Sequence, residues 1–160
     1  MPQAGKRIRR HGLATRLWHW LNALACLVML MSGLMILNAH PRLYWGEYGA
    51  NDDAAWLAFG AVDAVPFPGW MTIPSAYSLA DARLWHMAFA WVLALGLLAH
   101  LLAGLASGRL RRDIAGDGRT WPAALRYGRA QRIAYALVLL AALPAMIATG
   151  LAMAPAMDAA

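Results

Sequence analysis

Three long apolar stretches restrict what this chain can fold into. They run from about Leu17 to Leu37, from about Leu84 to Ala106 and from about Ile133 to Met153. A helix needs roughly 20 apolar residues to cross a bilayer, and each stretch is that long. With 61% hydrophobic and 14% charged residues, the chain also departs from the composition of soluble domains. We therefore expect an all-α fold, a polytopic transmembrane helix bundle with three spans in this chain.

The segments between the spans predict one transmembrane domain over the whole chain. An outer loop of about 38–83 separates the first two spans, and a second loop of about 107–132 precedes the third. The run Pro66-Phe67-Pro68-Gly69-Trp70 favours turns in the outer loop. Inside the third span Pro144 is expected to kink the helix, and Thr149 to satisfy the carbonyl that the proline leaves unbonded.

Basic residues predict the orientation of the spans. Of the 14 Lys and Arg residues, only Arg42 and Arg83 lie between the first and second spans. Because cytoplasmic segments carry an excess of Lys and Arg, we expect a multi-pass protein of the bacterial inner membrane with a cytoplasmic N-terminus. The basic start could also indicate a signal peptide, but Arg16 and His19 would interrupt its apolar core.

Other function classes fit the sequence less well. The net charge of +6 would suit nucleic acid, but the basic residues stand between apolar spans instead of on one basic face. A lone Cys26 excludes an internal disulfide and a cysteine-based metal cluster. A small transporter or metal permease would be expected to carry acidic side chains beside histidines within the spans, and the three spans hold none.

Histidines are the residues that carry chemistry here. An ionisable side chain inside a span is costly and usually marks a functional site, and His19, His86 and His100 are such residues. Imidazole is a common axial ligand of haem iron, and two imidazoles fill both axial positions of a b-type haem, whose role is electron transfer. His11 and His40 lie outside the spans and are expected to be solvated. No catalytic residue is predicted.

The depths of the three histidines restrict how they can pair. His86 and His100 are 14 residues apart on one helix, so they lie within about 40° of the same face and roughly 21 Å apart in depth. His19 enters from the cytoplasmic side and matches the depth of His100, whereas His86 lies near the outer side. One haem between His19 and His100 is therefore possible within this chain.

The tetrapeptide Arg-Leu-Trp-His occurs twice, each time where a span begins. Its arginines, Arg16 and Arg83, stand three residues before His19 and His86 on the same helical face. At the interface they could pair with haem propionates. The alternative for Arg16 is the ordinary excess of cytoplasmic basic residues. Gly33 lies 14 residues after His19, and a small residue there permits close approach of a helix or cofactor.

Several motifs together resemble the bacterial cytochrome b561 and nickel-hydrogenase type cytochrome b family. The motifs are His11-Gly12-Leu13-Ala14-Thr15-Arg16-Leu17-Trp18-His19-Trp20, Ser32-Gly33, Asn38-Ala39-His40-Pro41, Leu43-Tyr44-Trp45-Gly46 and Arg83-Leu84-Trp85-His86. That family supplies membrane subunits of hydrogenases, formate dehydrogenases and thiosulfate reductases. The resemblance implies a bundle of four or more helices around two b-type haems.

For this chain the resemblance implies that His19 and His86 are axial ligands whose partners come from a fourth helix. The sequence stops at Asp158-Ala159-Ala160, before such a helix. We therefore expect one or two haem b groups whose axial partners are incomplete in this chain, with His100 spare. Residues 1–160 alone should then hold haem weakly.

The expected function is electron transfer, without substrate chemistry of the chain's own. Electrons would pass between the quinone pool and a partner oxidoreductase subunit or c-type cytochrome, within membrane lipid and without nucleic acid. A rival from another class is a haem-free membrane anchor or assembly subunit, in which the histidines join helices by hydrogen bonds.

Overall fold

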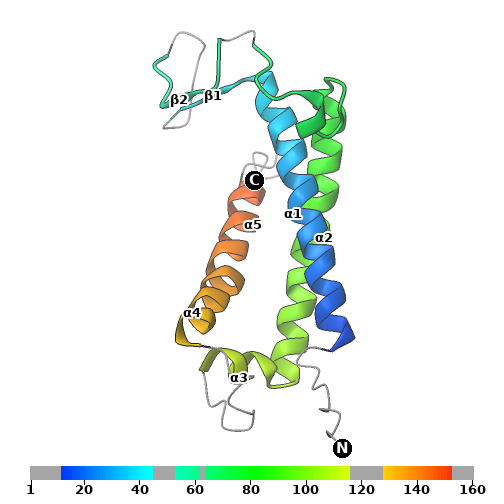
Figure 1. Ribbon diagram of the computed structural model, residues 1–160, viewed down its shortest axis with the longest axis vertical. Helices are drawn as coiled ribbons and strands as arrows, with labels where there is room; N and C mark the ends of the chain where they lie inside the picture. Colours follow the sequence, from blue (N-terminus) through cyan, green and yellow to red (C-terminus); the bar gives the residue numbers. More distant parts are fainter. Residues whose placement is uncertain (1–11, 45–52, 62–63, 116–127, 153–160) are drawn as a thin grey trace, which may run out of the picture. The chain divides into compact units, whose positions relative to one another are not determined.

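The computed structural model describes residues 12–44, 53–61, 64–115 and 128–152. Helices dominate the described residues, and the only strands among them are two residues long (Figure 1). The elements are α1 (Leu13–Ala39), β1 (Arg42–Leu43), β2 (Leu57–Ala58), η1 (Gly69–Met71), α2 (Leu79–Ala106), α3 (Arg109–Ala115), α4 (Arg129–Leu137), η4 (Val138–Ala142) and α5 (Leu143–Ala152). The predicted all-α class is confirmed.

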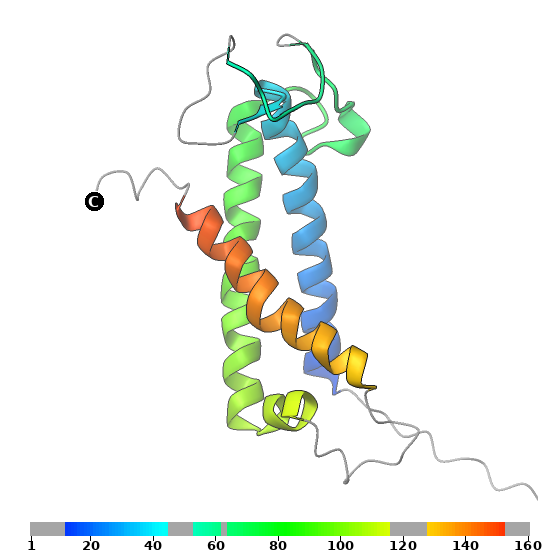
Figure 2. The ribbon, with the colours of Figure 1, turned by 90° about the vertical axis from the view of Figure 1, so that its left-hand side faces the viewer.

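Three helices are long and apolar enough to cross a membrane. They are α1, α2 and the run Arg129–Ala152, in which α4, η4 and α5 follow one another without a break (Figure 2). Each begins four or five residues before the expected span. At the start of α2 the reason is a local cap, because Ser78 Oγ accepts a hydrogen bond from the Asp81 N–H at 3.3 Å and donates one to Asp81 Oδ2 at 2.8 Å. Such reciprocal bonds stabilise a helix N-terminus.

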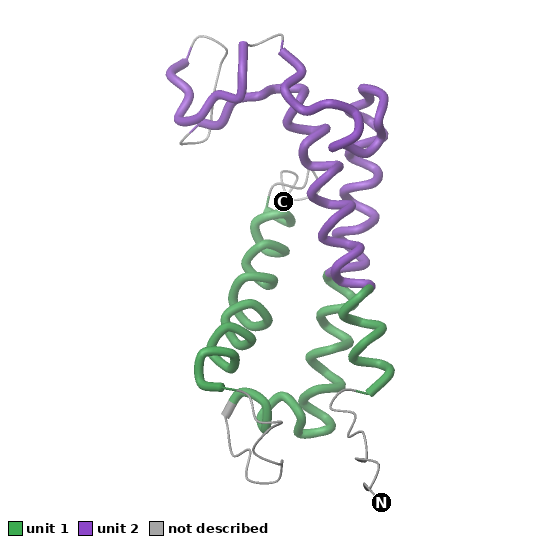
Figure 3. The backbone as a smooth tube through the Cα atoms, viewed as in Figure 1, with its two compact units in different colours: residues 1–20, 94–160 green, residues 21–93 purple. Residues whose placement is uncertain are grey.

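The chain divides into two compact units (Figure 3). One comprises residues 1–20 and 94–160, and the other comprises residues 21–93. In the unit of residues 21–93, the later part of α1 runs antiparallel to the first part of α2. In the other unit, the start of α1 runs antiparallel to the end of α2. Each unit therefore brings together two segments that are far apart in the sequence.

A connection between α1 and α2 packs back onto the end of α1. β1 pairs antiparallel with β2, with Arg42 opposite Ala58. Asn38 is only 4% exposed, and its side chain bonds both backbone groups of one loop residue: Nδ2 donates to the Phe67 carbonyl at 2.9 Å, and Oδ1 accepts from the Phe67 N–H at 3.0 Å. This amide holds the loop against the helix. The turns expected in this loop include the 3-10 turn η1.

One segment expected as loop is helical. Gly108, with a φ of +65°, ends α2, and α3 begins directly after it. A residue just beyond a helix often adopts this left-handed conformation, which glycine adopts without steric cost. The Arg109 guanidinium donates to the Thr15 hydroxyl of α1. The segment of about 107–132, expected as the loop before the third span, therefore contains the short helix α3 at its start.

The third apolar helix contains a π-helical turn, η4, directly before Pro144. The Leu143 N–H bonds to the Val138 carbonyl, five residues back instead of four. Proline lacks an N–H, and its ring clashes with the carbonyl four residues earlier, so a wider turn at this point relieves the clash. The prediction for Thr149 was wrong. Its hydroxyl bonds to the carbonyls of Ala145 and Met146 at 2.9 and 3.0 Å, because a helical threonine reaches only three or four residues back.

Candidate functional site

His86 lies beside Ser32 in the unit of residues 21–93. The Ser32 Oγ atom is 3.0 Å from His86 Nδ1. The same oxygen is 2.8 Å from the Val28 carbonyl and 3.2 Å from the Met29 carbonyl. Ser32 is completely buried, whereas His86 is half-buried. One nitrogen of the imidazole is therefore engaged by α1, and the other nitrogen, Nε2, is the one left for a ligand.

Gly33 of α1 faces the His86 ring. A Cβ atom at Gly33 would lie 3.6 Å from His86 Cε1 and 3.8 Å from His86 Nδ1. These are ordinary contact distances, so a methyl group fits there without displacing the ring. The close approach expected at Gly33 is thus the approach of the α2 histidine to the α1 backbone.

His100 is enclosed by two aromatic side chains in the unit of residues 1–20 and 94–160. The Trp18 indole stacks on it, with ring centroids 4.1 Å apart and an interplanar angle of 18°. The indole is itself held by a 2.8 Å hydrogen bond from Nε1 to the Gly96 carbonyl. On the other side, His100 Nε2 lies 3.4 Å from the Tyr135 hydroxyl of α4. We name these residues the Trp18–His100–Tyr135 cluster.

The His19 side chain does not point toward His100. Consecutive residues of a helix are about 100° apart around its axis, so His19 turns away from α2 when Trp18 faces it. Its ring is exposed and makes an edge contact with Trp20, at a centroid distance of 5.7 Å and an angle of 64°. The structure therefore brings His100 together with Trp18 and not with His19. The ring of His19 is open to a partner beyond this pair of helices.

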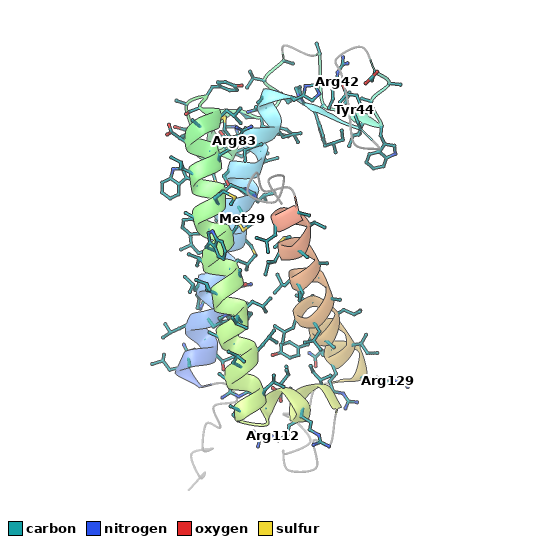
Figure 4. The ribbon with its side chains drawn as sticks, turned by 180° about the vertical axis from the view of Figure 1, so that it is seen from behind. Met29, Arg42, Tyr44, Arg83, Arg112 and Arg129 are labelled. Carbon is teal, nitrogen blue, oxygen red and sulfur yellow. The ribbon has the colours of Figure 1, made fainter. Side chains whose placement is uncertain are left out.

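The two arginines of the repeated tetrapeptide have exposed side chains. Arg16 lies in the first turns of α1. Arg83 lies in the first turns of α2, near the connection between α1 and α2 (Figure 4). Neither has an ion pair among the described residues. Both guanidinium groups therefore remain available to an anion at a helix end.

His40 was expected to be solvated, but its side chain is half-buried. His11 lies outside the described residues. The His40 ring is half-buried and stacks on Tyr44, with centroids 5.6 Å apart. Its Nε2 atom is buried and has no hydrogen-bond partner among the described residues. The prediction failed because the chain after α1 turns back in β1 and brings Tyr44 over the imidazole.

Sequence reasoning missed Ser32, Trp18 and Tyr135 as neighbours of the histidines. Counting residues along the antiparallel helices α1 and α2 would have identified Ser32 as a neighbour of His86. Ser32 lies seven residues before the end of α1, and His86 lies seven residues after the start of α2, so both are about 10 Å from the same end. Tyr135 could not be identified in this way. A long segment separates its helix from α2 in the sequence, so counting residues does not place Tyr135 beside His100.

The described residues contain no group of three or more His, Cys, Asp or Glu side chains that could hold a metal ion by themselves. Haem iron needs only one or two imidazoles, because the porphyrin supplies the other ligands. The three long apolar helices define a multi-pass membrane protein.

The chain matches the family model of prokaryotic cytochrome b561 over residues 10–160. It belongs to that family, as its motifs predicted. Members are generally haem b membrane electron-transfer subunits of oxidoreductase complexes. Neither the search of the curated proteins nor the search of the solved structures found a match.

Proposed function

We propose that this chain carries electrons between the quinone pool and a partner oxidoreductase subunit or c-type cytochrome by means of haem b. The observation that carries the proposal is the environment of His86, whose Nδ1 contacts Ser32 while its ring remains half-buried beside Gly33. The contact with Ser32 uses one ring nitrogen, and the second nitrogen supports the proposal because a haem ligand needs it for iron.

The residues present fit haem b as its ligands and anchors. His86 and His19 would each supply one imidazole nitrogen to haem iron, and Arg83 and Arg16 would hold propionate carboxylates at the helix ends by charge-assisted hydrogen bonds. When bound, haem supplies reversible one-electron transfer. In a bilayer, the apolar side chains around these histidines would keep water from the iron, which favours electron transfer over side reactions.

The test of this function is a reduced-minus-oxidised absorbance spectrum of the protein purified in detergent. We expect the sharp bands of a low-spin b-type haem. The second candidate, a haem-free anchor or assembly subunit, is favoured by the Trp18–His100–Tyr135 cluster, in which a histidine does join helices. A featureless spectrum from protein expressed with haem in excess would establish that candidate instead.

His100 has a structural role in this proposal. Its Nε2 atom faces the Tyr135 hydroxyl and one ring face is covered by Trp18, so iron could reach Nε2 only by displacing Tyr135. We therefore expect His100→Gln to keep the haem content and spectrum of the unaltered protein, because glutamine retains a hydrogen-bonding group. Pyridine haemochrome assay of the purified variant measures this. A loss of half the haem or more would make His100 an iron ligand.

The proposal includes a cytoplasmic N-terminus, which cysteine labelling tests. In a Cys26→Ser background, Ala54→Cys lies on an exposed part of the outer loop and Arg111→Cys lies on an exposed part of α3. An impermeant maleimide should label Ala54→Cys in spheroplasts and label Arg111→Cys only after lysis, because the basic segments remain inside. The reverse pattern would place the N-terminus outside.

A further inference from the structure

We propose that Ser32 is a positioning residue that fixes the protonation pattern of the His86 ring. The contact holds the imidazole with its proton on Nδ1 and its lone pair on Nε2. This inference rests on the proposed function, because it assigns the atom with which His86 ligates haem iron. It also assigns a role in tuning the haem to a hydroxyl group buried inside the membrane-spanning part of α1.

The hydrogen bonds of the Ser32 hydroxyl fix its direction. A hydroxyl carries one hydrogen, and the shortest contact of Ser32 Oγ is the Val28 carbonyl at 2.8 Å. Serine within a helix ordinarily donates to the carbonyl four residues back. Ser32 is 0% exposed, so water does not compete for this oxygen. Because Ser32 Oγ donates its hydrogen to the Val28 carbonyl, it can only accept a hydrogen bond from His86 Nδ1, which lies 3.0 Å away. His86 Nδ1 is therefore the donor.

The protonation pattern decides whether His86 can bind iron. A neutral imidazole carries one N–H, so a proton on Nδ1 leaves the lone pair of Nε2 for a metal. A ligating histidine that donates its other N–H to an acceptor is oriented by that bond and becomes a more basic ligand. A more basic ligand stabilises ferric over ferrous iron. The Ser32 hydroxyl should therefore lower the reduction potential of the haem that His86 ligates.

Ser32→Ala tests this inference on the full chain reconstituted with haem. The alanine removes only the acceptor oxygen, so we expect bound haem, an unchanged helix content and a midpoint potential higher than that of the unaltered protein. Ser32→Thr keeps the hydroxyl and should restore the original potential. The matched control is Gly33→Ala, which adds a methyl group at ordinary contact distance from the same ring and should leave the potential unchanged. Spectroelectrochemical titration measures all four proteins.

The possible outcomes separate this inference from the proposed function. An unchanged potential in Ser32→Ala that still holds haem would overturn the role of Ser32 and leave the electron-transfer function intact. An equal shift in Gly33→Ala would also overturn it, because packing alone would then explain the effect. If the unaltered protein binds no haem, the proposed function fails and the inference fails with it. If His86→Ala leaves both the haem content and the spectrum unchanged, the inference fails alone, because His86 is then not a ligand.

Discussion

Replacement of His86 by alanine should remove one haem from the protein or change its spectrum to that of a haem that has lost an imidazole. The reason is that haem iron would lose the imidazole nitrogen that His86 supplies. His19→Ala should have the same kind of effect on the haem near the other membrane face. Haem content per protein, together with the visible spectrum, measures both effects.

His40→Ala is the control for these two variants. It also removes a half-buried imidazole, but one that stacks on Tyr44 in the segment between α1 and α2. We expect it to retain the full haem content. If all three variants held equal amounts of haem with equal spectra, neither His19 nor His86 would be a ligand.

Asn38→Ala should lower the stability of the protein more than any surface substitution. The side chain satisfies both the N–H and the carbonyl of Phe67, and alanine leaves both groups without these partners. The two bonds are part-buried, and a polar group left unbonded where water does not reach it costs about 1–3 kcal/mol. We expect the free energy of unfolding to fall by roughly 2–4 kcal/mol, measured by reversible unfolding in mixed micelles.

Asn22→Ala provides a matched control on the same helix. Its Oδ1 atom is buried but accepts no hydrogen bond from the described residues, so alanine removes no such bond. Its unfolding free energy should change by no more than about 1 kcal/mol. Equal losses of stability in the two variants would show that the bonds of Asn38 to Phe67 do not hold the loop.

Position along a helix could be predicted from the sequence because it depends on counting residues. Apolar length gave the three helices, and the positions of His19, His86 and His100 along them followed. The same counting would have paired Ser32 with His86. The ends of the helices were less predictable, because helices continue into the interfacial region, where a cap such as Ser78 and not hydropathy decides where the first turn begins.

The direction of each side chain around its helix could not be predicted in the same way. All faces of a membrane helix are apolar, so no amphipathic pattern indicates which face meets a neighbour. The contact of Trp18 with His100 therefore had no signal, although it turns His19 outward. The role of Thr149 was also mispredicted, because its hydroxyl reaches only the carbonyls of Ala145 and Met146, and these lie after Pro144.

The π-helical turn in η4 bears on how chains of this kind can change in length. Such a turn holds one residue more than an α-helical turn, so it accommodates a single inserted residue without breaking the helix. Deletion of one residue between Val138 and Ala142 would convert the turn to α-helix, and because both kinds of turn make one revolution, α5 would keep nearly the same face relative to α4. Thr149 would then keep its place on the helix surface, and both helices would stay intact. A one-residue difference in length between related proteins is therefore tolerated at this point without redirecting the face of α5.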